Sequence, residues 1–151
     1  MPIDEYARLR RFEPLGITSF EWIGREDGVP SAASGLRLTV RDLATIGVMV
    51  AQGGVYDGCQ VVPTGWIEDS SQIATETQWG LNYSYLWFLM AGPSGDTILI
   101  ANGNGGQRLT VQPATNFLVS TFAGNYNDTN AWQVLAAVLV DFAIPEISRL
   151  R

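Results

Sequence analysis

The residues of this sequence whose types and spacing suggest chemistry stand in ANGNGGQRLTV, residues 101–111. Asn104, Gly105 and Gly106 fit a tight turn, because glycine and asparagine tolerate the positive φ that such turns require. Glycine also lets a backbone approach a bound molecule closely, since it has no Cβ. The run therefore predicts a hairpin turn, which can also present backbone groups to a ligand.

The composition excludes several kinds of active site within these 151 residues. There is no histidine, and all nine basic residues are arginine. A histidine-based triad, a lysine Schiff base, a phosphate-binding P-loop and a histidine metal site are thereby ruled out. Cys59 is the single cysteine and has no partner for an internal disulfide or a zinc cluster. We interpret Cys59 as structural and expect no metal site.

Charge and hydropathy limit the partners and the location. The net charge is −6, and the arginines form no basic stripe, so we expect no nucleic-acid partner. The first ten residues lack the apolar core of a signal peptide. The most apolar run, residues 131–144, is too short to span a bilayer. We expect a soluble protein, cytoplasmic or periplasmic, whose compartment the sequence does not identify.

The first half of the chain predicts helices separated by an ordered loop. A helix is expected over residues 3–12, and residues 15–38 are expected to form a loop that Trp22 anchors by burial. Thr39 and Asp42 form a capping box for a helix that ends at Gly53 and Gly54. A turn and strand are expected over residues 56–62. A short helix follows Pro63, with Trp66 in the core.

The second half predicts a sheet and a final helix. Residues 79–90 are aromatic-rich and strand-like. Residues 97–123 are expected to form three antiparallel strands with turns at 103–106 and 113–116. A helix is expected over residues 129–141, lying across these strands because it is apolar on nearly every side. The fold class is α+β: helices, then an antiparallel meander, then a covering helix.

Three segments, taken together and in order, resemble one family. They are FEPLGITSFEW, then residues 31–67, then residues 101–125. They resemble the serine hydrolases related to class C β-lactamases and penicillin-binding proteins, which include esterases and 6-aminohexanoate-dimer hydrolases. The resemblance implies a partial β-lactamase/transpeptidase-like fold and no cofactor. It also implies that residues 1–78 are the later part of a helical domain, and that residues 79–151 are sheet strands and the last helix of an α/β domain.

Two of the three active-site motifs of that family are absent. Ser-x-x-Lys supplies the nucleophile and its base, and this sequence has no lysine. The second motif is Tyr-x-Asn or Ser-x-Asn, and no asparagine of this sequence has Tyr or Ser two positions before it. The resemblance thus implies the C-terminal portion of a hydrolase, inactive by itself. Its expected partner is a missing N-terminal half or a second copy of the chain.

The third motif, Lys/His-Thr/Ser/Gly-Gly, corresponds to Asn104-Gly105-Gly106. The resemblance assigns Asn104, Gly105 and Gly106 to substrate binding and the backbone N–H of Gln107 to half of the oxyanion hole. Asn104 replaces the usual cation, which favours neutral esters or amides over carboxylate-bearing lactams. The alternatives are a non-catalytic ligand-binding module, built on the aromatic residues, and a structural subunit.

Overall fold

The computed structural model describes residues 1–32, 34–128 and 130–149. Its centre is a six-stranded antiparallel sheet in which every strand pairs with its sequence neighbour, in the order β10-β9-β8-β7-β6-β5. The strands are β5 (Thr75–Glu76), β6 (Asn82–Ser84), β7 (Trp87–Ala91), β8 (Thr97–Gly103), β9 (Gln107–Gln112) and β10 (Phe117–Thr121). Short connections between successive strands produce this meander.

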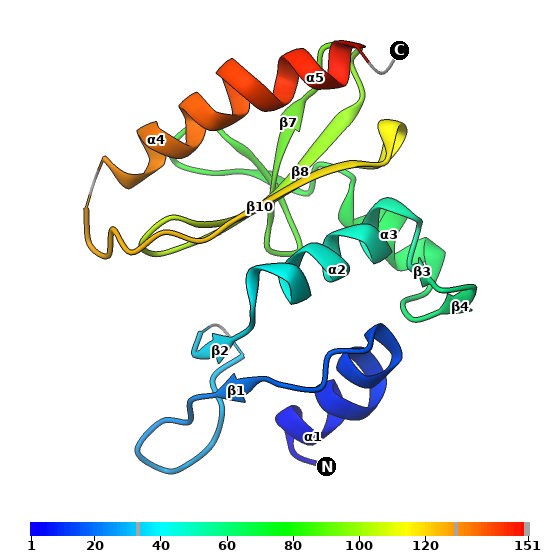
Figure 1. Cartoon of the computed structure of the whole chain (residues 1–151), viewed down its shortest axis with the longest axis vertical. Helices are drawn as coiled ribbons and strands as arrows, with labels where there is room; N and C mark the ends of the chain where they lie inside the picture. Colours follow the sequence, from blue (N-terminus) through cyan, green and yellow to red (C-terminus); the bar gives the residue numbers. More distant parts are fainter. Residues whose placement is uncertain (33, 129, 150–151) are drawn as a thin grey trace.

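Helices cover both faces of the sheet (Figure 1). One face carries the C-terminal helix, composed of α4 (Ala131–Ala137), the π-helical η4 (Val138–Ala143) and α5 (Ile144–Arg149). The opposite face carries α2 (Val40–Ala51). This double coverage explains why β9 is buried from Leu109 to Gln112 although its sequence alternates apolar and polar residues.

Helix α2 packs on β9 and β10 through a glycine. A Cβ added at the buried Gly47 would lie 2.9 Å from Leu109 Cδ1 and 3.3 Å from Leu118 Cδ2. The absent side chain therefore lets the helix lie close to the sheet. The helix begins with the predicted capping box, in which Thr39 Oγ1 accepts from the Asp42 N–H and the Asp42 carboxylate accepts from the Thr39 N–H.

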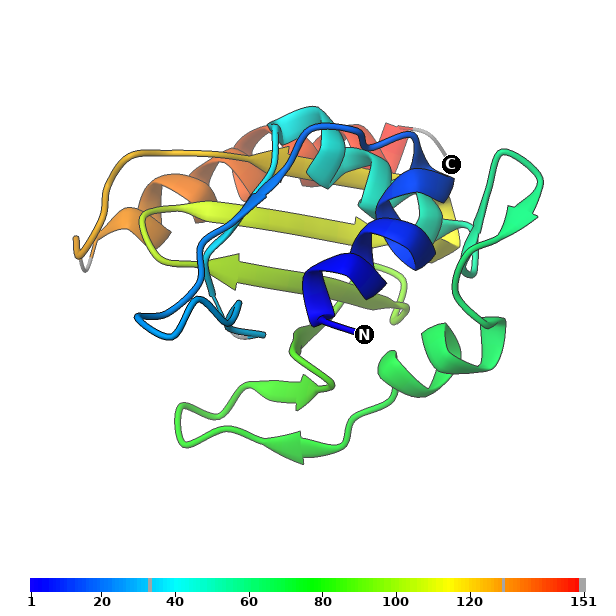
Figure 2. The ribbon, with the colours of Figure 1, turned by 90° about the horizontal axis from the view of Figure 1, so that it is seen from below.

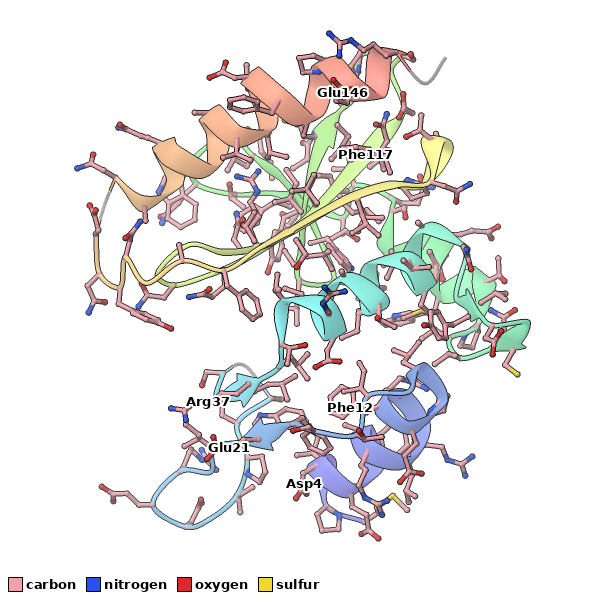
Figure 3. All side chains as sticks on the ribbon, viewed as in Figure 1. Asp4, Phe12, Glu21, Arg37, Phe117 and Glu146 are labelled. Carbon is pink, nitrogen blue, oxygen red and sulfur yellow. The ribbon has the colours of Figure 1, made fainter. Side chains whose placement is uncertain are left out.

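The N-terminal segment forms a layer beyond α2. Helix α1 (Ile3–Ala7) continues through the π-helical η1 (Arg8–Phe12) and the 3₁₀ turn η2 (Glu13–Leu15). Phe12 points from this segment toward α2 (Figure 3) and belongs to the same buried core as Leu99 and Val111 of the sheet. Figure 2 shows the N-terminal helix and α2 crossing the sheet on one side.

Two hairpins and one helix complete the chain. Strands β1 (Glu21–Trp22) and β2 (Leu36–Arg37) pair antiparallel, and the Arg37–Glu21 ion pair, 2.9 Å long, joins their exposed side chains (Figure 3). Strands β3 (Val55–Tyr56) and β4 (Cys59–Gln60) form a second small hairpin. Helix α3 (Thr64–Ser70) starts after Pro63, as the sequence predicts.

The predicted α+β class, the three strands between residues 97 and 123 and their two turns are confirmed. The strand-like stretch 79–90 contains two strands, β6 and β7, which fold back on each other around Tyr85 and Leu86, whose φ values are 41° and 74°. Neither residue is a usual choice for a left-handed turn, so the sequence shows no turn there. Strand β5 was not expected, and the loop before α2 contains the β1–β2 pair.

Three further expectations are corrected. The last helix does not end at residue 141 but continues to Arg149. Trp66 is not in the core: it is 51% exposed and its ring contacts that of Tyr85. Val140 and Phe142 are exposed, so the last helix is not buried on every side. Cys59 is a free, exposed thiol.

The contact at Gly47 gives a stability test. Gly47→Leu should lower the free energy of unfolding by about 1–3 kcal/mol, because a side chain must displace Leu109 and Leu118 in a packed interior. The matched control is Gly65→Leu in α3, where an added Cβ meets nothing within 4 Å. That variant should be neutral or slightly stabilising, since leucine forms helix better than glycine. Urea denaturation measures both; equal effects would contradict this packing of α2.

Candidate functional site

A cleft of about 720 Å³ lies at the end of the β8–β9 hairpin. It is bounded by the β1–β2 segment, the start of α2 and the two hairpin strands. The apolar part of its lining consists of Trp22, Ala32, Leu36, Leu38, Leu43, Ala101, Leu109 and Phe122. The polar part consists of Ser34, Asn102, Asn104, Gln107 and Arg108, together with Gly35 and Gly103. Much of the cleft is therefore apolar, with polar side chains gathered along the hairpin.

Trp22 fixes the loop that forms one wall of the cleft. Its indole N–H lies 2.9 Å from the Ser31 carbonyl oxygen and 3.1 Å from that of Ser34. The ring is half-buried, and it packs against the main core. The prediction that Trp22 anchors this loop is confirmed. The aromatic ring gives the cleft a flat apolar side.

The turn predicted to carry function is held by a later segment of the chain. The Asn104 amide N–H lies 3.1 Å from Asn127 Oδ1, and Asn104 Oδ1 accepts from the Asn127 N–H, also at 3.1 Å. The Gly105 carbonyl accepts from the Asn125 N–H at 3.1 Å. A Cβ at Gly105 would lie 2.7 Å from the Tyr126 ring, and its φ is 85°, so this position requires glycine.

Gln107 makes the same kind of contact one residue beyond the turn. Its side-chain N–H groups donate to the Ala123 carbonyl at 2.8 Å and to the Asn104 carbonyl at 3.2 Å. Its Oε1 accepts from the Ala123 N–H at 3.2 Å. The amides of Asn104 and Gln107 are thus engaged by residues 123–127. Asn104 and Gln107 therefore contribute their backbone groups and the shape of the turn to the cleft.

The structure brings part of the predicted site together. Asn104 and Gln107 line the cleft, whereas Gly105 and Gly106 are buried behind it, with φ values of 85° and 92°. In the strand register Gln107 pairs with Gly103, so its backbone belongs to the last residue pair of the β8–β9 hairpin before the turn. The assignment of the Gln107 N–H to an oxyanion hole stays a prediction.

Arg108 is also among the residues that line the cleft, and sequence reasoning did not single it out. Because side chains alternate along β9, its side chain lies with that of Thr110 on the sheet face opposite Leu109. It is half-buried, and burial lowers the pKa of its guanidinium because the charged form loses hydration. Its side chain has one hydrogen bond, from Nε to Thr110 Oγ1 at 3.3 Å, and it belongs to none of the ion pairs among the described residues. A signal was available: Arg108 is the only basic residue between Arg41 and Arg149.

Neither a metal-binding cluster nor a membrane-spanning helix is found among the described residues. Within residues 1–32, 34–128 and 130–149, no three Cys, Asp or Glu side chains gather closely enough to hold a metal ion. In the same residues no helix combines the length and the apolar character needed to cross a bilayer.

Comparison with known proteins supports the resemblance seen in the sequence. No family model matches the chain. It is similar to the 6-aminohexanoate-dimer hydrolase of Paenarthrobacter ureafaciens, at 29% identity over 77% of this chain and 32% of that protein. Its fold matches a Bacillus anthracis protein assigned as a 6-aminohexanoate-dimer hydrolase, with a TM-score of 0.81 and 19% identity over 99% of this chain and 39% of the other.

A second solved structure widens the fold comparison. The octameric penicillin-binding protein homologue from Pyrococcus abyssi matches with a TM-score of 0.65 and 19% identity, over 91% of this chain and 37% of that one. The predicted likeness to β-lactamase-related and penicillin-binding-protein-like hydrolases is thus confirmed. The chain spans about a third of the length of these relatives.

The bonds that hold the turn can be tested with a matched pair of variants. Asn127 and Asn116 both have a positive φ, 61° and 52°. Asn127→Gly removes the side chain that accepts from Asn104 but keeps a residue suited to that backbone. We expect it to destabilise the fold by about 0.5–1.5 kcal/mol, one net hydrogen bond. Amide exchange at residues 104–107 should also accelerate.

Asn116→Gly is the control, because no hydrogen bond of its side chain is found in the described structure. It should leave both the stability and the exchange rates at residues 104–107 nearly unchanged. Hydrogen-exchange NMR and urea denaturation give the two readouts. Equal exchange rates in both variants would show that residues 123–127 do not hold the turn.

Proposed function

We propose that this chain, a relative of the β-lactamase-like hydrolases, supplies the sheet side of the active site of a serine hydrolase that cleaves esters or amides. The observation that carries the proposal is the cleft, which forms against the end of β8 and the residues that the family resemblance assigns to the third motif. Asn104 and Gln107 line it, and a loop segment holds both in place.

The chemistry proposed for this side of the cleft is stabilisation of negative charge. Acyl transfer develops an oxyanion on the attacked carbonyl, and a fixed backbone N–H stabilises it without reorganising. Following the resemblance, we assign that donor to Gln107. One such donor contributes about 2.7–4 kcal/mol to transition-state stabilisation in known hydrolases. The bonds between Gln107 and Ala123 would keep this backbone fixed.

The attacking group must come from outside the printed residues. They contain no lysine and no histidine, so the Ser-x-x-Lys pair of the family has no counterpart in them. The half-buried apolar residues Leu38, Leu43 and Ala101 line the cleft. We propose that they pack against the segment that carries the nucleophile.

We propose the substrate class by analogy with the relatives. One of them is named as the hydrolase of the 6-aminohexanoate dimer. A cleft with an apolar wall and a polar hairpin suits an ester or amide whose chain lies on the wall while its carbonyl meets the hairpin. No cofactor is needed for this chemistry.

The proposal predicts that the chain is inactive alone and active when completed. Hydrolysis of a chromogenic short-chain ester and of a cephalosporin by the isolated chain should equal that in buffer, because no nucleophile and base are present. A chimera in which this chain replaces the matching region of the Paenarthrobacter ureafaciens relative should be active. The measurement is initial hydrolysis rate against ester, amide and lactam.

The control is the same chimera with the serine of its Ser-x-x-Lys motif replaced by alanine, which should abolish turnover. A chimera that folds cooperatively but hydrolyses none of the substrates would contradict the proposal. So would serine-directed turnover by the isolated chain, detected as stoichiometric labelling by a fluorophosphonate.

The structure also predicts association. Strand β10 ends the sheet order, and large apolar side chains are exposed, among them Phe142 at 69% and Trp79 at 70%. An unpaired strand edge and exposed apolar surface favour pairing with another chain. Light scattering at micromolar concentration should show dimers or larger species. Co-expression with the N-terminal segment of a relative should dissociate these species. A strictly monomeric chain that binds no hydrophobic dye would contradict this.

A further inference from the structure

We propose that Phe122 determines acyl specificity: its ring contacts the acyl chain of the substrate, so the cleft prefers a chain with an apolar, aromatic end over a short one. The inference rests on the proposed function for the reaction that it describes. The binding itself is argued from the cleft and is tested without turnover.

Phe122 lies beside the residue proposed to bind the substrate carbonyl. The last pair of the β9–β10 ladder is Arg108 with Thr121. The next position along this register places Phe122 beside Gln107, where neighbouring strands lie about 4.8 Å apart. The Gln107 side chain bonds to both the N–H and the carbonyl of Ala123, which keeps the two segments together beyond the ladder.

The side chain of Phe122 is on the face of the sheet where the cleft lies. Side chains alternate along a strand, so Phe122 shares a face with Leu118 and Ser120. That face packs on α2: Leu118 Cδ2 would lie 3.3 Å from a Cβ at Gly47, and the Ser120 hydroxyl donates to the Val40 carbonyl at 3.2 Å. Phe122 lines the cleft and is 45% exposed, so much of its ring is open to a ligand.

The neighbours of Phe122 at this end of the hairpin leave its ring to a ligand. In the row across the three strands, Gly103 has no side chain and the Gln107 amide is already bonded to Ala123. Among the described residues that line the cleft, Arg108 alone is charged, and its side chain lies on the opposite face with Thr110. An apolar ring beside a carbonyl-binding backbone favours an apolar chain.

Trp22 adds a second aromatic ring to the lining. Its indole N–H is bonded to the Ser31 and Ser34 carbonyls, so the ring is held in place and offers apolar surface. An acyl chain that begins at Gln107 thus meets Phe122 first, and the apolar lining to which Trp22 belongs can enclose its end.

The binding test uses 3-phenylpropanamide and propanamide, which share the amide group and differ in the ring. Binding to the isolated chain is followed by NMR, through the phenylalanine ring signals and the tryptophan indole N–H signals. We expect 3-phenylpropanamide to shift the Phe122 signals and to bind about tenfold or more tightly than propanamide, because its ring is removed from water.

Phe122→Ala should weaken 3-phenylpropanamide by about 3- to 10-fold and leave propanamide unchanged, since only the aromatic contact is lost. Phe122→Leu, which keeps part of the apolar surface, should lie between. The control is Phe142→Ala, which removes an exposed phenylalanine of the C-terminal helix that does not line the cleft. It should bind as the unmodified chain does. Circular dichroism and urea denaturation verify that the variants fold.

The active chimera gives a second readout. Phe122→Ala should lower kcat/KM for p-nitrophenyl 3-phenylpropanoate by about 3- to 10-fold. The value for p-nitrophenyl acetate, whose chain is too short to cover the ring, should stay nearly unchanged. Equal losses for the two esters would overturn the inference, because Phe122 would then act on the fold and not on the acyl chain.

The inference is also overturned if the unmodified chain binds the two amides equally, or binds neither, or if Phe122→Ala and Phe142→Ala bind 3-phenylpropanamide equally well. An inactive chimera would refute the proposed function while leaving the binding preference intact. Unselective binding would refute the role of Phe122 while leaving hydrolysis intact.

Discussion

The pairing of β8 with β9 is the constraint on which the cleft and most of the core depend. Both strands are internal to the sheet, between β10 and β7, and Leu99 and Val111, which face each other in the register, are fully buried. Helix α2 packs onto this pair through Gly47, and the C-terminal helix covers the other face. The strand ends that leave this packed centre, residues 101–104 and 107–109, line one side of the cleft. Core and cleft are consequently two parts of one hairpin.

A turn with two adjacent glycines would ordinarily be mobile, and its position here is fixed by contacts from residues 123–127. The Asn104 side chain donates to the Asn127 side chain and accepts from the Asn127 backbone N–H, and the Tyr126 ring covers Gly105. The glycines are required because the φ values are positive and because the ring occupies the space of a Cβ. Polar side chains that look available in the sequence are thereby used for structure.

How far the sequence predicts the molecule depends on how local each signal is. The capping box of Thr39 and Asp42, the helix after Pro63 and the strands between 97 and 123 follow from neighbours a few residues apart, and the structure has them. The β6–β7 turn was missed because Tyr85 and Leu86 give no local sign of a positive φ. Trp66 was placed in the core on its type alone, although its exposure is decided by which distant elements cover it. The division at residue 78 stays a prediction.

The candidate site divides in the same way. The glycine turn is visible in the sequence because its geometry demands particular residues, and the family resemblance gives it a role. The burial of Arg108 and the engagement of Asn104 by a segment 23 positions away both depend on long-range contacts, which no local pattern reveals. A chain without lysine or histidine cannot supply a nucleophile and base by the family's means, but these contacts hold a shaped turn beside an apolar wall. In the proposed hydrolase, this surface would position the acyl substrate while another segment attacks it.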